Sequence, residues 1–232
     1  MNKCPFCEES ELLSAHLDMK RCSSCKLFIK SKPVPKQHLK EHLKDFLLSA
    51  CWREESYIDR MNDAEHQMKC LHTFSAPGKL YDVGAASGFF MKKAREYGWD
   101  VSGNDISAAG VKFAKENFQL AIDHEFFEDV GLESSTYDAV VMWNTLEHTH
   151  NPSHTVFEAK RILKKGGLLF IKVPEMPTLE LLKVYYDPYH FFEFNVKNLS
   201  NFLSQNGFKQ LMVNKLWKRY ELSATEYLFE KE

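Results

Sequence analysis

The sequence Leu80-Tyr-Asp-Val-Gly-Ala-Ala-Ser-Gly-Phe-Phe90 combines a short apolar strand, a glycine-bearing turn and the start of a helix. Gly84 and Gly88 allow the backbone to approach a ligand closely, and a helix that starts at Phe89 offers free backbone N–H groups. A dinucleotide fingerprint has the pattern G-x-G-x-x-G, but here Ala86 and Phe89 stand at the second and third glycine positions. The turn therefore favours a nucleoside ligand that is less anionic than a pyrophosphate.

A carboxylate follows at the end of the next expected strand. Asp105 lies 21 residues after Gly84 and directly after the segment Val101–Asn104. An acidic residue at this place in an open α/β sheet accepts hydrogen bonds from the hydroxyls of a ribose. Alone, Asp105 would equally serve as a helix N-cap before Ser107, but its combination with the Gly84 turn favours ribose binding.

Short apolar strands alternate with amphipathic helices from Lys79 onward, which predicts an α/β fold with a mostly parallel sheet and helices on both faces. The expected strands are Leu80–Val83, Val101–Asn104, a strand around His124–Phe127, Ala139–Trp143 and Leu168–Val173. The expected helices are Gly88–Tyr97, Ala108–Asn117, Ser153–Leu163 and Val196–Gln205, and a final strand pair is expected at Phe208–Val213 and Glu226–Glu230.

Four cysteines near the N-terminus form two pairs with the spacing C-x2-C, namely Cys4 with Cys7 and Cys22 with Cys25. Each pair presents two thiolates from one tight turn, and two such turns complete a tetrahedron around Zn²⁺. A module of roughly 30 residues cannot bury enough surface to fold alone, so we expect the zinc to be structural. The spacing predicts a small Cys4 zinc ribbon.

The chain divides into three parts at its prolines. We expect a zinc ribbon at 1–35, a helical connector at 36–76 and an α/β domain at 77–232. Pro33 and Pro35 mark the first boundary because each fixes its own backbone and biases the preceding residue away from helix. Apolar residues at three- and four-residue spacing predict helix between His38 and Phe74, and Ala76-Pro-Gly78 ends that stretch. The isolated Cys51 and Cys70 are expected to be ordinary thiols.

The composition excludes several classes of protein. The chain has 232 residues, of which 44% are hydrophobic and 27% charged, which excludes disorder and fibrous repeats. With 30 basic and 32 acidic residues, the formal charge of −2 gives no overall attraction to nucleic acid or to an anionic membrane. No apolar run is long enough for a membrane span and no apolar signal segment opens the chain, so we expect a cytoplasmic protein without a membrane partner.

Several further segments match one enzyme family in order. They are Asp82-Val-Gly84 with Gly88, Gly98-Trp-Asp-Val-Ser-Gly-Asn-Asp-Ile-Ser107, Phe127-Glu-Asp-Val130, Tyr137-Asp-Ala-Val-Val-Met-Trp-Asn-Thr-Leu-Glu-His148 with Asn151-Pro152, Arg161-Ile-Leu-Lys-Lys-Gly-Gly-Leu-Leu-Phe-Ile-Lys-Val-Pro174, Asp187-Pro-Tyr-His190 and Asn206-Gly-Phe208. Over about 79–208 the chain resembles the class I S-adenosylmethionine-dependent methyltransferases, which have a Rossmann-like fold. The cysteine module resembles the zinc-ribbon prefix of a subset of these enzymes. Ala86 and Asn104 are mild departures from the family pattern.

The resemblance implies S-adenosylmethionine as cofactor and a methyltransferase activity (EC 2.1.1.-). It also implies roles for particular positions. Asp82 and Gly84 would lie near the methionine end of the cofactor, with Ala86 and Gly88 in the same turn. The ribose would contact Asp105 and Ile106, and the adenine would contact Phe127 and Glu128. Asn144, at the carboxyl end of the expected fourth strand, would face the ligand crevice.

Two histidines are candidate catalytic bases, because an unperturbed imidazole pKa of about 6.5 suits proton transfer near neutral pH. They are His148, which would follow the fourth strand, and His190, in the aromatic segment Tyr185–Phe194. We expect His190 to be more important for catalysis than His148, since a long connecting segment rich in aromatic residues can form a lid over an acceptor. Each histidine could instead be structural, and the aromatic rings could line either a pocket or the core.

The resemblance to glycan and secondary-metabolite methyltransferases implies a small-molecule acceptor such as a sugar, a glycan precursor or a secondary metabolite. One alternative is RNA methylation with the ribbon as docking surface, because Lys or Arg occupies eight positions between Asp18 and Lys44 against two acids. An ordinary solvent-exposed surface would explain the same basic residues without RNA. The other alternative is a non-catalytic protein that binds the cofactor.

Overall fold

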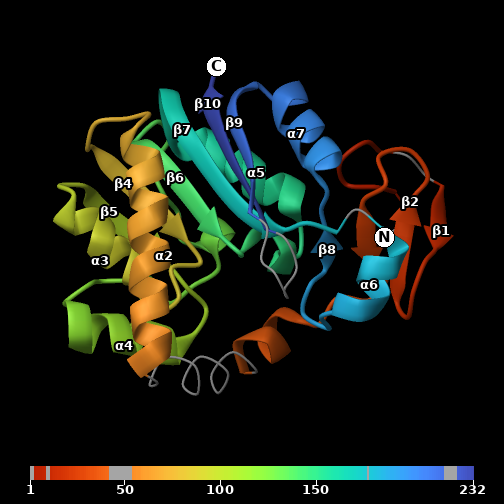
Figure 1. Ribbon diagram of the computed structural model, residues 1–232, viewed down its shortest axis with the longest axis horizontal. Helices are drawn as coiled ribbons and strands as arrows, with labels where there is room; N and C mark the ends of the chain where they lie inside the picture. The colour runs from red at the N-terminus through yellow and green to blue at the C-terminus, as the bar shows by residue number, and fades with distance from the viewer. Residues whose placement is uncertain (1–2, 9–10, 42–53, 177, 217–223) are drawn as a thin grey trace. The chain divides into compact units, whose positions relative to one another are not determined.

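The computed structural model describes residues 3–8, 11–41, 54–176, 178–216 and 224–232 (Figure 1). The chain forms two compact units, each built from segments that are distant in sequence. Unit 1 contains Met1–Val34, Trp143–Lys160 and Leu169–Glu232, and unit 2 contains Pro35–Met142 and Arg161–Leu168. The domain boundaries expected after residues 35 and 76 stay a prediction.

Unit 2 contains the parallel strands that begin the α/β fold. Strand β4 (Lys79–Val83) pairs in parallel with β5 (Asp100–Asn104) on one side and with β6 (Tyr137–Trp143) on the other. The helices are α2 (Glu54–His72), α3 (Phe89–Glu96) and α4 (Ala108–Phe118). Apolar residues from α3, from α4 and from the segments that follow β4 and α4 form a buried cluster, which includes Ala85, Phe89, Met91, Phe113, Ala114, Phe118, Leu120 and Ile122.

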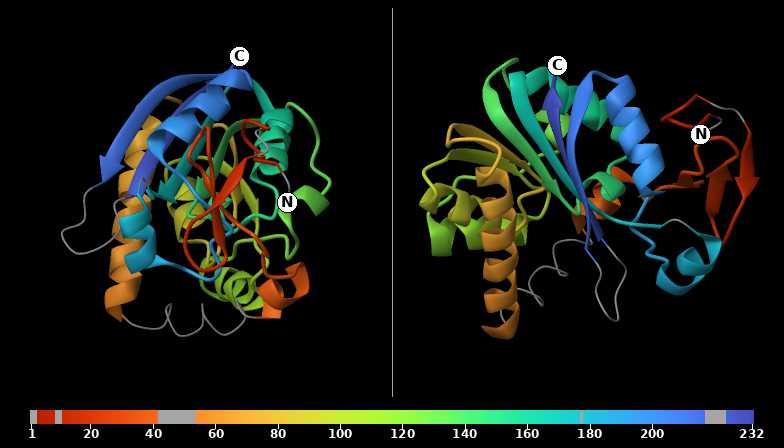
Figure 2. Two further views of the ribbon diagram at one scale, coloured as in Figure 1. Left: turned by 90° about the vertical axis from the view of Figure 1, so that its right-hand side faces the viewer. Right: turned by 45° about the horizontal axis from the view of Figure 1, so that its top comes forward.

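Unit 1 contains a four-stranded antiparallel sheet with the order β1-β2-β3-β8. Strands β1 (Leu12–Ser14), β2 (Met19–Cys22) and β3 (Phe28–Lys30) come from the N-terminal module, drawn in red in Figures 1 and 2. Strand β8 (Phe192–Glu193) comes from far along the chain and pairs with β3, in the register Phe28↔Glu193 and Ile29↔Phe192. The predicted ribbon therefore shares its sheet with a later segment.

The rest of unit 1 completes the α/β architecture. Its helices include α5 (Pro152–Ile162), α6 (Leu179–Tyr185) and α7 (Val196–Gln205), and β9 (Phe208–Leu216) pairs antiparallel with β10 (Ala224–Lys231). Including β7 (Leu163–Pro174), the strand order of the larger sheet is β5-β4-β6-β7-β10-β9. The predicted α/β class is confirmed. Among the residues that the structure describes, no helix has the length and apolar character needed to cross a membrane.

One predicted strand is wrong. Around His124–Phe127 the chain forms only an isolated bridge at Asp123, followed by the 3-10 helix η1 (Phe127–Asp129). The reason is local polar bonding. The Glu125 carboxylate accepts a hydrogen bond from the Phe126 N–H, and the Glu125 carbonyl accepts one from the Asn104 side chain. These bonds replace the ladder that a strand would need.

The predicted connector helix is described only in part, and the boundary between α5 and β7 differs from the prediction. Residues 36–41 and α2 are helical as expected, whereas 42–53, with the predicted helix there and Cys51, lie outside the described residues. Helix α5 ends at Ile162, and β7 begins at Leu163, earlier than predicted. Lys164 bonds both oxygens of Asp138 at 2.8 and 2.9 Å, and this anchors the early part of β7.

Candidate functional site

The turn after β4 has a left-handed backbone at three positions. The φ angles of Gly84, Ala86 and Gly88 are 73°, 49° and 74°. A glycine adopts this conformation without strain, whereas Ala86 does so at a cost. The N–H groups of Gly84 and Ala85 both donate to the Asn104 carbonyl, at 3.0 and 2.9 Å, so the turn is bonded to the end of β5.

Asp105 fixes the shape of this turn. One carboxylate oxygen accepts a hydrogen bond from the Ala86 N–H at 2.7 Å, and the other accepts one from the Ser107 N–H at 2.7 Å. The residue is 8% exposed, and this burial raises its pKa even though the two N–H donors oppose the shift. A carboxylate has about four acceptor sites, so Asp105 can hold the turn and still accept hydrogen bonds from a ligand.

Asp82 is the second buried acid beside the turn. It is 1% exposed, and its Oδ1 atom has no hydrogen-bond partner among the residues that the structure describes. Burial, with a contribution from the charge of Asp105, raises the pKa of Asp82 well above its usual value. A buried acceptor without a donor is costly unless a ligand supplies that donor. This atom therefore offers a place for a cationic or N–H-bearing group.

Gly110 was not singled out by sequence reasoning, although it brings α4 against the turn. A Cβ atom at this position would lie 2.6 Å from the Ala86 carbonyl oxygen. The available signal was a glycine in the first turn of a helix, where alanine has the better propensity.

Gly110→Ala is expected to destabilise the protein by about 1–3 kcal/mol, since the added methyl group must push the helix and the turn apart. Urea unfolding followed by circular dichroism measures this change. The matched control is Ala108→Ser on the exposed side of the same helical turn, which should stay within about 0.5 kcal/mol. Equal stability of the two variants would show that α4 does not press on the turn.

The residues expected near an adenine have structural partners. The Phe127 ring is 4% exposed and packs on Tyr81 with centroids 5.7 Å apart. The Glu128 carboxylate lies 2.9 Å from the ammonium group of Lys36. The Ile106 carbonyl accepts a hydrogen bond from His124 Nε2 at 3.0 Å. The contacts of these three residues with a cofactor stay a prediction.

Asn144 follows β6 in a left-handed conformation, with a φ angle of 50°. Its backbone N–H donates to the Lys172 carbonyl at 2.8 Å, and its side chain is exposed. The side chain is therefore available to a ligand, as expected for a residue at the carboxyl end of a strand.

The two predicted histidines lie together in unit 1. His148 ends the 3-10 helix η2 (Leu146–His148), and His190 lies just before β8. Their ring centroids are 4.8 Å apart. His148 Nδ1 donates to the Tyr189 carbonyl at 2.9 Å, and His190 Nδ1 lies 3.0 Å from a carboxylate oxygen of Glu193.

These rings differ in protonation. Burial lowers the pKa of His148 to about 4, assisted by the charge on His190. Although burial opposes it, the hydrogen bond and charge of Glu193, with the charges of Glu147 and Asp187, raise the pKa of His190 to about 9. At neutral pH His148 is the neutral ring and His190 the cation, so His148 is the one that can accept a proton.

Two buried carboxylates beside the histidines were missed by sequence reasoning. Glu147 and Glu193 are each 1% exposed. Their positions, directly before His148 and three residues after His190, were the only sequence signal. In the described ranges, neither oxygen of Glu147 has a hydrogen-bond partner.

The rings of the aromatic segment Tyr185–Phe194 are divided between two surroundings. Phe191, Phe192 and Phe194 are at most 1% exposed, so they belong to the core. The Tyr186 hydroxyl accepts a hydrogen bond from Lys30 at 2.6 Å and donates one to Asp18 at 2.7 Å. Tyr186 therefore ties the segment to the N-terminal module.

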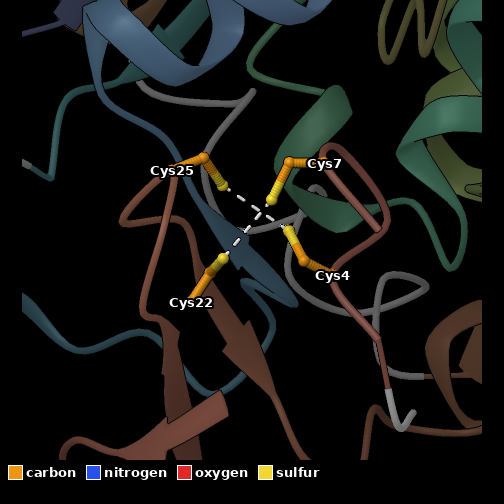
Figure 3. A group of neighbouring side chains, drawn as sticks. All are labelled: Cys4, Cys7, Cys22 and Cys25. Carbon is orange, nitrogen blue, oxygen red and sulfur yellow. Dashed lines mark hydrogen bonds between the residues drawn. The ribbon is translucent and has the colours of Figure 1, made fainter. Parts of the chain in front are cut away.

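The four cysteines converge as predicted (Figure 3). One ligand atom of each lies within 4.8 Å of the others, and Cys4–Cys25 and Cys7–Cys22 are both 3.5 Å apart at their sulfurs. A tetrahedron with Zn–S bonds of about 2.3 Å has its sulfurs about 3.8 Å apart. A hydrogen bond from Cys25 lowers the pKa of Cys4 to about 5, so one thiolate is already present. The set fits a Zn²⁺ ion.

A profile of the methyltransferase domain family matches residues 54–213. The chain belongs to the class I S-adenosylmethionine-dependent methyltransferases. The predicted family is thereby confirmed, and the methyltransferase profile covers both the turn after β4 and the histidine pair.

Curated relatives of the chain vary in kind. Highly reducing polyketide synthase verA of Penicillium polonicum is 30% identical over 146 residues, which are 56% of this chain and 6% of the relative. A probable S-adenosylmethionine-dependent methyltransferase of Mycolicibacterium smegmatis is 24% identical over 67% of this chain and 61% of its own length. Ubiquinone biosynthesis O-methyltransferase of Xanthomonas oryzae is 26% identical over 49% of this chain and 55% of its own length. The chain thus spans at most 61% of the length of these relatives.

Solved structures agree on the fold. Magnesium protoporphyrin IX methyltransferase from Synechocystis, with bound SAH, superposes with a TM-score of 0.67 at 14% identity, over 85% of this chain and 99% of that one. A possible histamine N-methyltransferase from Thermotoga maritima superposes with a TM-score of 0.64 at 17% identity, over 82% of this chain and 99% of that one. At such identities the likeness concerns the fold alone.

Proposed function

We propose that the protein transfers a methyl group from S-adenosylmethionine to a small-molecule acceptor, such as a sugar, a glycan precursor or a secondary metabolite. The observation that carries this proposal is the pair of buried acids, Asp82 and Asp105, beside the turn after β4. Two carboxylates repel a pyrophosphate and suit a nucleoside that carries an ammonium group and a sulfonium. This charge pattern supports the less anionic ligand expected from the sequence.

The residues of the turn fit parts of the cofactor. Asp82, with its unpartnered oxygen, would accept a hydrogen bond from the methionine ammonium group. Asp105 would accept the ribose hydroxyls through its remaining lone pairs. Gly84, Ala86 and Gly88 let the backbone come close to the ligand. When bound, S-adenosylmethionine supplies an activated methyl group, and the protein has to orient the acceptor and exclude water.

Asp105→Ala is expected to weaken S-adenosylmethionine binding by about 1–3 kcal/mol, because the ribose hydroxyls lose a charged acceptor. Titration calorimetry measures the affinity. Since Asp105 also bonds the Ala86 and Ser107 N–H groups, thermal denaturation should show a lower melting temperature in the same variant. Asp100→Ala, at the exposed start of β5, is the matched control. Equal cofactor affinity in a folded Asp105→Ala protein would refute the ribose assignment.

The charges near the N-terminus support a small acceptor over RNA. Lys30 is buried and pairs with Asp18 at 3.2 Å. Lys36 pairs with Glu128, and Lys40 pairs with Glu125 at 2.9 Å. Three of the basic residues that raised the RNA alternative thus have acidic partners within the chain, which reduces their attraction for phosphates.

The histidine pair is the proposed acceptor side. His148 would take a proton from an acceptor hydroxyl, and the cationic His190 would stabilise negative charge there. Both remain proposed catalytic residues. The first experiment is transfer of a labelled methyl group from S-adenosylmethionine to fractionated small-molecule and RNA pools, and label appearing only in RNA would overturn the acceptor class.

We also propose that Cys4, Cys7, Cys22 and Cys25 hold one structural Zn²⁺ ion. The convergence of four sulfurs in a small module supports this assignment, since the ion would provide the folding free energy that such a module lacks.

A further inference from the structure

The geometry points to a second metal site, in which Glu147, His148 and His190 bind a divalent transition-metal ion. One ligand atom from each of these residues lies within 4.8 Å of the other two. Two imidazoles and one carboxylate form a common ligand set for such ions and leave coordination positions open. The site is separate from the four cysteines but uses the two histidines of the proposed acceptor side. With an ion bound, both Nε2 atoms would be ligands, so the ion would take the place of the His148 base and of the His190 cation.

Glu147 is the first observation that indicates a missing ligand. Its side chain is 1% exposed, and within the described part of the chain neither carboxylate oxygen has a hydrogen-bond partner. A buried carboxylate without donors is strongly unfavourable. Glu193, also 1% exposed, has its Oε2 atom unpartnered as well. A cation between these acids and the histidines would supply a partner for these buried oxygens.

The orientation of the two rings is the second observation. His148 Nδ1 donates to the Tyr189 carbonyl at 2.9 Å, and His190 Nδ1 donates to the Glu193 carboxylate at 3.0 Å. Metal-binding histidines typically donate one ring N–H to a carbonyl or a carboxylate, which fixes the ring and leaves the other nitrogen for the ion. In both residues this leaves Nε2 as the ligand atom.

The backbone holds the ligands in place. The Phe191 N–H donates to the Glu147 carbonyl at 2.8 Å, which joins the His190 segment to η2. The Phe191 carbonyl in turn accepts a hydrogen bond from the Lys30 N–H at 2.8 Å, and β3 pairs with β8. A site built from two segments that are bonded in this way is preorganised for an ion.

The competing explanation is an ion-pair cluster in which His190 stays protonated, with Nδ1 3.0 Å from a Glu193 oxygen and Nε2 3.9 Å from an Asp187 oxygen. In that case the positive charge of His190 already compensates the acids, and the cluster binds no metal. An ion would instead replace the proton on His190 Nε2. Metal binding therefore separates the two explanations.

The test is a titration of the zinc-loaded 232-residue chain with Co²⁺ alone, without cofactor or acceptor. Visible absorption reports Co²⁺ bound to nitrogen and oxygen ligands, and thiolate charge-transfer bands would reveal Co²⁺ in the cysteine site. Elemental analysis after dialysis checks that the zinc is retained. We expect one Co²⁺ per chain beside the zinc, with no thiolate bands, and a melting temperature that rises with Co²⁺ concentration.

Glu147→Gln keeps the shape of the side chain and removes its charge, so it should weaken Co²⁺ binding about 100-fold or more while the metal-free protein stays folded. Glu193→Gln, which acts through His190, should weaken it by about 10–100-fold. His154→Ala, an exposed histidine on α5, is the matched control and should bind as the wild type does. The proposal is overturned if the wild type binds no Co²⁺ beyond the cysteine site, or if Glu147→Gln binds it equally well.

Discussion

Cys22→Ser is expected to release the zinc ion and to unfold the N-terminal module. The apparent binding free energy of a structural zinc ion is about 10–16 kcal/mol, which is as large as the stability of a whole domain. Because β3 pairs with β8, the loss should extend to Phe192 and Glu193 in the later segment. Elemental analysis gives the zinc content, and hydrogen exchange shows which backbone amides lose protection.

The same variant should leave unit 2 folded, because that unit has a separate buried cluster between its sheet and helices. Amides of β4 and β5 are expected to keep their protection when those of β3 and β8 lose it. Cys70→Ser, at a cysteine of α2 outside the four-cysteine cluster, is the control and should retain the zinc. A wild-type protein prepared without chelator that contains no zinc would refute the metal assignment.

His190→Ala is expected to lower turnover on the true acceptor by about 10²-fold or more. The ring is 8% exposed and carries a proton at neutral pH, between the charges of Glu193 and Glu147. Its removal takes away either the cation or a metal ligand from the proposed acceptor side. Cofactor affinity should stay within about 0.5 kcal/mol, because Asp82 and Asp105 belong to unit 2.

Removal of a buried cation also leaves acidic side chains uncompensated, so the stability of His190→Ala should fall by about 3–5 kcal/mol. Steady-state kinetics must therefore be measured well below the melting temperature of the variant. His154→Ala again serves as the control for both stability and turnover. Near-normal turnover in folded His190→Ala protein would make the ring structural and leave His148 as the candidate base.

Local signals predicted the parts of the fold that are stabilised locally. Helix α7 begins and ends where expected because Asn195 and Asn198 form a capping box and Asn206-Gly207 follows its last residue. The turn after β4 was predicted because glycines mark positions that need a left-handed backbone. The predicted strand around His124–Phe127 is wrong because the Glu125 side chain bonds the local backbone, which a short apolar pattern does not reveal.

The candidate site was predictable only in part, for a different reason. Asp82, Asp105 and the cysteine pairs could be found because their spacing is short and regular. The role of Glu147 depends on its distance from His190, 43 residues later, and on the burial of both. The pairing of β3 with β8 joins residues more than 160 positions apart, and only the folded chain shows it. Non-local contacts of this kind leave no periodic trace in a sequence.

The bonded strands β3 and β8 also couple two equilibria. If zinc binding orders β3 and thereby β8, a ligand that orders the His190 segment must tighten zinc binding by the same factor, because thermodynamic linkage is reciprocal. Zinc exchange measured with a competing chelator should then slow when the histidine site is occupied. Removal of the zinc by a chelator would act in the opposite direction and lower the affinity of the histidine site.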